Sequence, residues 1–274
     1  MTSGKLPIAL TIAGSDSGGG AGIQADLKTF HAFGVFGTSA LTAITAQNTL
    51  GVRAIHPIPL EVVRAQIDVV AEDLRPGGAK TGMLATASLV RTVAEAIRQH
   101  GITNYVMDPV MVATSGDRLL DVDAQEALVT ELLPLATLVT PNLHEAEILI
   151  GHPVSTIQEM RHAARKLVEM GAGAALVKGG HLLEGEAVDL LWDGTRERVW
   201  RRIRLDTTHT HGTGCTLSAA AAAALARGLP LPEAVDLAVD FVTRAIRTAP
   251  GLGQGHGPIN HFAGTRYLPG LGHT

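Results

Sequence analysis

The residues with the clearest capacity for chemistry lie in the turn His-Thr-His-Gly-Thr-Gly-Cys at residues 209–215, just before an alanine-rich stretch. Gly212 and Gly214 allow the backbone to turn tightly and to approach a ligand closely. The stretch at residues 219–227 is typical of a helix, and the amides at a helix N-terminus lack intrahelical partners and attract anions. The turn therefore predicts a site for phosphate, or for negative charge that develops in a transition state.

Cys215 is the single cysteine of the chain and lies in this turn. A helix N-terminus favours thiolate over thiol, so we predict that Cys215 acts as a base or a nucleophile. A lone cysteine is more often a small buried apolar residue, and that alternative stays open. A second alternative is Cys-His nucleophilic catalysis with His209 or His211 and Asp206. A transition-metal site at the two histidines is disfavoured, because the sequence offers no matching second cluster of ligands.

Short apolar segments alternate with helical periodicity along the chain. We predict strands at residues 8–13, 39–46, 79–81, 105–108, 138–140 and 174–178, with helices between them. Apolar residues at helical spacing define two of these helices, one with Val63 and Ile67 and one with Val235 and Ala238. Such alternation is typical of parallel strands joined by crossover helices. Residues 187–203 break the pattern and predict an antiparallel pair around an Asp193-Gly194 turn.

Polar residues follow the predicted strands at the points where the strands end. Because ligands bind beyond the carboxyl ends of parallel strands, we expect these residues to converge at one edge of the sheet. The set comprises Gly14, Ser15, Asp16, Gln47, Asn48, Asp108, Asn142, Glu145 and Lys178. We also expect the glycine-rich residues 15–22 to form a mobile lid over the site.

Asp108 and Glu145 are candidate ligands of Mg²⁺, which prefers oxygen donors and needs only one or two carboxylates. Glu145 stands three positions after Asn142, a spacing that also predicts a helix capping box. Lys178 precedes two glycines and can reach phosphate oxygens, although a surface lysine at a strand end is the alternative. The common nucleotide loops are absent, because residues 78–81 and 18–22 do not satisfy their glycine spacing. An ATP enzyme with this sequence must use residues 212–215 as its phosphate cradle.

Composition limits the class of protein. The chain has 274 residues, a net charge of −4 and 46% hydrophobic residues, and it lacks the basic patch that nucleic-acid binding needs. One cysteine excludes an intramolecular disulfide framework and fits a reducing compartment. The apolar runs are shorter than the roughly 20 residues of a membrane span, so we expect a soluble cytoplasmic protein without a membrane partner. We expect a single domain over residues 1–274, with residues 265–274 as a frayed tail.

Seven segments of the chain carry a family resemblance. They lie at residues 10–30, 45–49, 108–111, 140–146, 177–181, 209–218 and 255–258. Together and in this order they resemble the hydroxymethylpyrimidine/phosphomethylpyrimidine kinases of thiamine biosynthesis, which are members of the ribokinase-like superfamily. In that superfamily a Gly-(Ala/Thr)-Gly-Asp turn opens a helix of this kind and its Asp is the catalytic base. Here Cys215 stands in its place, as is typical of the pyrimidine kinases and of their pyridoxal-kinase relatives.

The resemblance implies a ribokinase-like three-layer α/β sandwich, with a central, mostly parallel sheet, helices on both faces and a small antiparallel addition. It implies ATP- and Mg²⁺-dependent phosphorylation of 4-amino-5-hydroxymethyl-2-methylpyrimidine, then of its monophosphate to the diphosphate. It also implies a small-molecule substrate and a homodimer. A pyridoxal or pyridoxine kinase of the same fold remains an alternative, as does a pyrimidine-binding regulator without catalysis.

The same resemblance assigns roles to individual residues. Gln47 reads the pyrimidine through its side-chain amide, and Gly14, Met83 and Val110 form the pocket wall. Asp26 belongs to the substrate side and orders the glycine-rich loop, with an exposed helix residue as the alternative. The catalytic and phosphate-binding set is Gly212, Thr213, Gly214, Cys215 and Lys178, nucleotide contacts include Asn142, and Asp108 with Glu145 organise Mg²⁺. Cys215 serves the hydroxymethyl step, because the phosphate oxygen that attacks in the second step is already anionic.

Overall fold

The computed structural model describes residues 6–111, 122–183 and 186–264. The frayed tail predicted for residues 265–274 lies outside the described residues. Within these ranges no helix is long and apolar enough to cross a membrane.

A single mixed sheet runs through the described part of the chain in the order β3-β2-β1-β4-β5-β6-β7-β8-β9. The six central strands, β2, β1, β4, β5, β6 and β7, pair in parallel. At one edge β3 pairs antiparallel with β2, and at the other edge β8 and β9 continue the sheet in antiparallel pairs. The strands are β1 (Ile8–Asp16), β2 (Phe36–Asn48), β3 (Gly51–Pro57), β4 (Gly78–Thr81), β5 (Tyr105–Met107), β6 (Leu138–Val139), β7 (Ala175–Leu183), β8 (Glu186–Trp192) and β9 (Glu197–Ile203).

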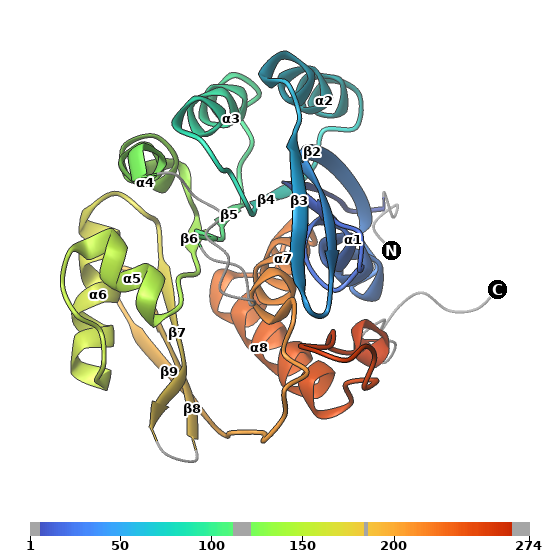
Figure 1. The fold of residues 1–274 in the computed structure, drawn as a ribbon. Helices are drawn as coiled ribbons and strands as arrows, with labels where there is room; N and C mark the ends of the chain where they lie inside the picture. Colours follow the sequence, from blue (N-terminus) through green and yellow to red (C-terminus); the bar gives the residue numbers. More distant parts are fainter. Residues whose placement is uncertain (1–5, 112–121, 184–185, 265–274) are drawn as a thin grey trace, which may run out of the picture.

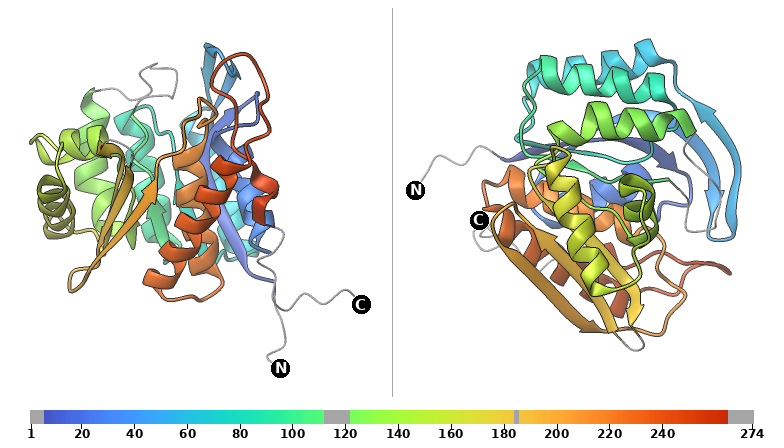
Figure 2. Two further views of the ribbon diagram at one scale, coloured as in Figure 1. Left: turned by 90° about the horizontal axis from the view of Figure 1, so that it is seen from below. Right: turned by 90° about the vertical axis from the view of Figure 1, so that its left-hand side faces the viewer.

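Helices cover both faces of the sheet and give three layers (Figures 1 and 2). Two separate apolar clusters fill the interfaces, one beneath α2 to α6 and one beneath α1, α7 and α8. The helices are α1 (Gly22–Ala32), α2 (Leu60–Asp73), α3 (Ala87–Gln99), α4 (Val122–Ala127), α5 (Leu143–Ile150), α6 (Ile157–Glu169), α7 (Thr213–Ala226) and α8 (Leu231–Arg247). Short helical turns follow at η1 (Leu128–Leu132), η2 (Leu133–Leu135) and η3 (His261–Gly264).

Local sequence explains where several helices begin. The side chains of Asn142 and Thr156 accept hydrogen bonds from the backbone amides of Glu145 in α5 and Glu159 in α6, respectively. The carboxylates of Glu145 and Glu159 in turn accept the backbone amides of the two capping residues. These reciprocal bonds satisfy donors that a helix start leaves unpaired. Thr86 caps α3 in the simpler way, through its side chain alone.

Helix α7 is made of small residues and lies close against the sheet. Its residues 219–224 are all buried alanines. A Cβ placed on Gly78 of β4 would lie 2.8 Å from the carbonyl oxygen of Ala222, so a side chain there would push the helix away. This close approach explains how a chain with 3% aromatic residues fills its core, namely by short distances between layers rather than by bulk.

The structure confirms the six predicted parallel strands and the hairpin around Asp193-Gly194, where Gly194 has a φ of 88°. It adds β3, which sequence reasoning missed because most of its residues are exposed and follow no apolar pattern. The helix predicted to follow the glycine turn is confirmed. Helix α7 begins at Thr213, so the glycine turn forms its N-cap and first turn.

Candidate active site

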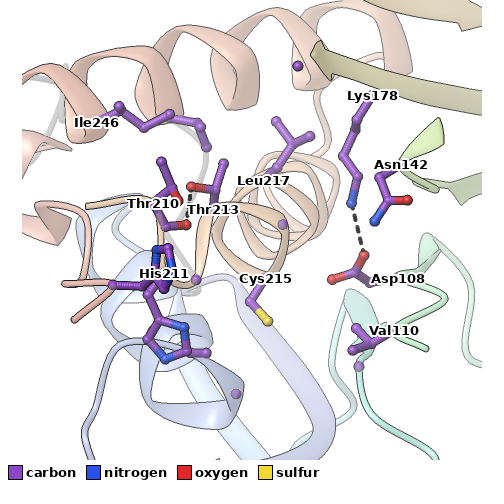
Figure 3. Close-up of a pocket in the computed structure, with 18 of the residues that line it drawn as sticks. Asp108, Val110, Asn142, Lys178, Thr210, His211, Thr213, Cys215, Leu217 and Ile246 are labelled. Atoms are coloured by element: carbon purple, nitrogen blue, oxygen red, sulfur yellow. Dashed lines mark hydrogen bonds and ion pairs between the residues drawn. The ribbon is translucent and has the colours of Figure 1, made fainter. Parts of the chain in front are cut away.

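A cavity of about 630 Å³ opens at the carboxyl ends of the parallel strands, beside the N-terminus of α7 (Figure 3). The convergence expected from the strand pattern is therefore confirmed for most of the predicted residues. Those that line the cavity are Gly14, Ser15, Asp16, Gln47, Met83, Asp108, Val110, Asn142, Glu145, Lys178, Gly212, Thr213, Gly214 and Cys215. Asn48 and Asp26 are not among the lining residues.

Gly212 caps α7 in the left-handed region, with a φ of 80°. A Cβ there would lie 1.8 Å from the carbonyl oxygen of Gly20, so the position needs glycine for both conformation and space. The first intrahelical bond runs from the Thr216 amide to the Gly212 oxygen at 2.8 Å. The amides of Gly214 and Cys215 precede this bond and therefore lack intrahelical partners. They supply the donors that the sequence predicted for an anion.

A lysine and two carboxylates lie next to this helix start. Lys178 Nζ lies 3.3 Å from Asp108 Oδ1, and the hydroxyl of Ser218 donates to Asp108 Oδ2 at 3.2 Å (Figure 3). A Cβ on Gly214 would lie 3.2 Å from Lys178 Nζ and 3.9 Å from Asp108 Oδ2. The first turn of α7, the ammonium and the carboxylate thus meet at one point. The absence of a side chain at Gly214 leaves room there.

Glu145 is held under the cavity by the capping box, in which its Oε2 accepts the Asn142 amide at 2.8 Å. Burial raises the pKa of Glu145 to about 7, and the nearby charge of Asp108 adds to the rise while Lys178 opposes it. Burial also disfavours the charged form of Lys178, but the carboxylates of Asp108 and Glu145 outweigh it and raise the pKa of the ammonium. The cluster holds more negative charge than one lysine balances, which favours a cationic ligand.

The chemistry of these donors fits Mg²⁺. Asp108 and Glu145 offer carboxylate oxygens, which this ion prefers, and it needs few protein ligands because it keeps water and phosphate oxygens. Among the residues that the structure describes, no group of three or more His, Cys, Asp or Glu side chains forms a metal-binding cluster. The site therefore suits an ion shared with a phosphate ligand rather than one enclosed by protein side chains.

The prediction that the helix start makes Cys215 a thiolate was wrong for the ligand-free protein. Enclosure by protein raises the pKa of the thiol to about 11, and the charges of Asp26 and Asp108 add to this. The ammonium of Lys80 and the amide of Gly22 oppose the rise without cancelling it. Low dielectric and nearby carboxylates thus favour the neutral thiol in the ligand-free protein.

Asp26 also corrects an expectation. It is fully buried, so the alternative of an exposed helix residue was wrong. It bonds to Lys80 Nζ at 3.0 and 3.1 Å and accepts the Thr11 hydroxyl at 2.6 Å. Lys80 lines the cavity, whereas Asp26 does not. Lys80 was missed as a partner, because residues 78–81 were considered as a strand and as an incomplete nucleotide loop but not as the source of a buried charge. The signal was a lysine inside a short strand with buried neighbours.

The histidines do not assemble a Cys-His nucleophile. His211 Nε2 lies 2.9 Å from Asp16 Oδ2, so the carboxylate that pairs with this imidazole is Asp16 and not Asp206. His209 is not among the residues that line the cavity. The geometry therefore favours an anion-binding helix start over a thiol protease-like triad.

Gln47, Gly14, Met83 and Val110 line one end of the cavity, as predicted. A Cβ on Gly14 would lie 2.6 Å from the Met83 methyl carbon, so the glycine lets this methionine close the wall. Gln47 Oε1 accepts the Thr45 hydroxyl at 3.1 Å. Since His211 Nε2 gives its hydrogen to Asp16, it cannot accept from the Gln47 amide nitrogen 3.5 Å away, which stays free to donate to a ligand.

The other end of the cavity was not found from the sequence. Leu217, Val242 and Ile246 give it an apolar wall, and Arg202, paired with Asp189, forms its polar side. The residues of α8 carried the helical pattern of a core helix, so nothing in the pattern distinguished those that face the cavity. The Asp189–Arg202 pair depends on the register between β8 and β9, which spacing alone does not show.

The chain is similar to known proteins in sequence and in fold. The family model described as phosphomethylpyrimidine kinase matches residues 16–260. The hydroxymethylpyrimidine/phosphomethylpyrimidine kinase of Bacillus subtilis is 49% identical over 93% of this chain and 94% of its own length. A bifunctional thiamine biosynthesis protein of Geobacter sulfurreducens is 50% identical over 92% of this chain and 52% of its own length. The crystal structure of an ADP complex of Bacillus subtilis pyridoxal kinase superposes with a TM-score of 0.88, at 41% identity, over 94% of this chain and 98% of that chain.

The raised pKa of Glu145 predicts a gain in stability when its charge is removed. In the folded state the pKa of Glu145 is about 7 rather than the ordinary 4.5. The contribution of this carboxyl group to stability is therefore fully present below pH 4.5 and is lost as the pH rises through 7. We expect Glu145→Gln to raise the free energy of unfolding at pH 8 by roughly 1–3 kcal/mol and to change it little at pH 4.5. Urea unfolding of the ligand-free protein at both pH values measures this.

Glu159→Gln is the matched control, because Glu159 fills the same capping position in α6 but is exposed. Hydrogen bonds from Ser155 and Thr156 lower the pKa of Glu159, so the control is expected to lose stability or stay unchanged at pH 8. Equal effects of the two substitutions would contradict the account of Glu145.

Proposed function

The chain belongs to the phosphomethylpyrimidine kinase family, and from this premise we propose how its cavity transfers a phosphoryl group. It is a kinase of thiamine biosynthesis that phosphorylates 4-amino-5-hydroxymethyl-2-methylpyrimidine and then the resulting monophosphate. ATP is the phosphoryl donor, in keeping with the nucleotide complex of its structural neighbour. The residue roles below are our proposals.

We propose that the γ-phosphate of ATP binds where α7, Lys178 and Asp108 meet. The observation that carries this is the space at Gly214, within 4 Å of both charged groups and next to two amides without intrahelical partners. Phosphoryl transfer needs positioning and charge stabilisation more than covalent help. The amides of Gly214 and Cys215 would orient the oxygens, and the Lys178 ammonium would neutralise charge on them.

Mg²⁺ would be held by Asp108 and Glu145, directly or through water, with Asn142 fixing Glu145 through the capping box. The ion would supply further neutralisation of phosphate charge when it is bound. Glu145 must lose its proton to act as a ligand, so its raised pKa couples binding of the cation to proton release. Thr213 would add a hydroxyl beside the nucleotide phosphates.

At the substrate end, Gln47 would donate its free amide hydrogens to a ring nitrogen of the pyrimidine and accept from the amino group. Gly14, Met83 and Val110 would enclose the ring, since together they form the wall of that end of the cavity. Asp26 would act through Lys80 rather than touch the substrate, because Lys80 lines the cavity and Asp26 does not. At the opposite end, the apolar wall of Leu217, Val242 and Ile246 would receive the purine base.

Cys215 would act on the hydroxymethyl group. The thiol would first release its proton to solvent water, and the nearby Lys80 ammonium would stabilise the thiolate that remains. The thiolate would then take the hydroxyl proton as the oxygen bonds to the γ-phosphorus, and the bond to ADP breaks with the electron pair on ADP. The second step needs no such base, because the attacking phosphate oxygen is anionic.

This role predicts an unequal effect of Cys215→Ala on the two steps. We expect kcat for the hydroxymethyl substrate to fall by about 100-fold or more, whereas kcat for the monophosphate falls by less than about 5-fold. Cys215→Asp should retain the first step, because a carboxylate also accepts a proton. Steady-state assays with each substrate measure both variants. Equal losses in the two steps would contradict the base role, and loss of all activity in Cys215→Asp would favour a thiol nucleophile.

We also propose that the protein forms a homodimer through the β3 edge. Large apolar side chains there are exposed, including Ile44 (48%) on β2, Leu50 (62%) in the turn between β2 and β3, and Ile55 (45%) on β3. The β3 strand lies at the end of the sheet, where its outward backbone groups can pair with another strand.

The dimer proposal predicts that Ile55→Lys gives a monomer, because a charge would be buried against the partner without compensation. Sedimentation equilibrium at micromolar concentration measures the mass. Ile203→Lys, on β9 at the opposite edge of the sheet and 85% exposed, is a control expected to keep the wild-type mass. A wild-type mass of about 28.6 kDa would contradict the proposal.

Phosphorus NMR tests the activity itself. Purified protein with Mg-ATP is incubated separately with the hydroxymethylpyrimidine, its monophosphate and pyridoxal. We expect a monophosphate from the first substrate and a diphosphate from the second, a product that an alcohol kinase does not make. Turnover of pyridoxal alone would assign the chain to vitamin B6 salvage, and no turnover in any tube would contradict the kinase assignment.

A further inference from the structure

The glycine-rich loop after β1 is filled by its own carboxylate. Asp16 is 3% exposed, and its Oδ1 accepts the Gly18 amide at 2.8 Å. Its Oδ2 accepts the amides of Gly20 at 3.0 Å and Ala21 at 2.8 Å. Burial alone would raise the pKa of Asp16, but these amides and His211 lower it below its ordinary value. The loop amides are therefore engaged by an internal anion and do not form a second phosphate cradle.

His211 joins this loop to the start of α7. Its Nε2 donates to Asp16 Oδ2 at 2.9 Å, and a Cβ on Gly20 would lie 2.4 Å from the imidazole Cδ2, so ring and loop are in contact. The backbone amide of His211 donates to the Gly257 oxygen at 3.1 Å. Gly212, the N-cap of α7, follows directly in the chain. A shift of the imidazole would therefore shift the cap.

The same loop also holds the strand that carries Gln47. Ser17 Oγ accepts a hydrogen bond from the backbone amide of Gln47 at 2.8 Å and donates one to the backbone carbonyl oxygen of Gln47 at 2.8 Å. This reciprocal pair replaces a missing strand partner at the end of β2. The loop is thus bonded to Gln47 on one side and, through Asp16 and His211, to the helix start on the other.

We propose that Asp16 and His211 are positioning residues that hold the α7 amides at a fixed distance from Gln47. The proposal rests on the function given above, because it assigns Gln47 to the pyrimidine and the amides to the transferred phosphate. Two substrates bound to separate elements react only if those elements keep their spacing, and a displacement of about 1 Å can cost about 100-fold in rate. In this proposal the two side chains, which line the cavity, set that spacing and do not act on the reacting atoms.

Three variants test the pair. His211→Leu keeps the bulk of the side chain and removes the donor, whereas His211→Gln keeps a donor nitrogen at a similar reach. His100→Leu is the matched control, because it breaks another His–Asp pair, His100 with Asp68 at 2.6 Å between α3 and α2, away from the cavity. Circular dichroism and thermal unfolding measure the folded fraction of each variant.

Two readouts are compared. The first is kcat with the KM values for the pyrimidine and for ATP. The second is the rate at which Ellman's reagent modifies Cys215, the single thiol of the chain, which reports the first turn of α7 without any turnover. We expect His211→Leu to lower kcat by roughly 10- to 100-fold with KM changes below about 3-fold, and to speed modification by about 10-fold or more. His211→Gln should restore both to within about 3-fold, and His100→Leu should alter neither.

Several results would overturn the proposal. Wild-type kcat and thiol reactivity in His211→Leu would show that the pair positions nothing. Parallel losses in His211→Leu and His100→Leu, in proportion to folded fraction, would reduce the pair to ordinary stability. A wild-type enzyme that leaves the pyrimidine unphosphorylated would contradict the proposed function, and the thiol reactivity of the three variants would still decide the positioning role.

Discussion

The close approach of the first turn of α7 to its neighbours is the constraint on which the rest of the site depends. Gly212 touches the glycine-rich loop, and Gly214 leaves space beside Lys178 and Asp108. The helix can come this near because it is built of alanines and because Gly78 lets it lie against the sheet. A larger residue at any of these glycines would separate the amides from the charged groups that must act with them.

Charge divides the buried polar groups into two kinds. Asp26 with Lys80 and Asp16 with His211 are already paired, so they hold structure in the absence of ligand. Asp108 and Glu145 share one lysine, and burial of this excess raises the pKa of Glu145. Such an imbalance lowers the stability of the ligand-free protein and is relieved when a cation and a phosphate bind. The same carboxylates that cost stability therefore favour binding of the substrates.

The sequence allowed the sheet and much of the site to be predicted, because apolar strands and the polar residues that follow them obey simple rules of parallel sheets. It did not allow β3 to be predicted, since that exposed strand exists through its pairing with β2. The Asp26–Lys80 and Asp16–His211 pairs join residues 54 and 195 positions apart, respectively, and no local pattern connects them. The thiolate predicted for Cys215 is disfavoured in the ligand-free protein because burial, which spacing does not show, raises the pKa of the thiol.

In the proposed mechanism the transferred phosphate binds at the start of α7 and not in the glycine-rich loop. A crystal structure with Mg²⁺, a non-hydrolysable ATP analogue and the hydroxymethylpyrimidine tests it most directly. The account predicts γ-phosphate oxygens within about 3 Å of the Gly214 and Cys215 amides and of Lys178 Nζ, with the pyrimidine on Gln47. A γ-phosphate bound to the amides of Gly18, Gly20 and Ala21, with Asp16 displaced, would contradict it.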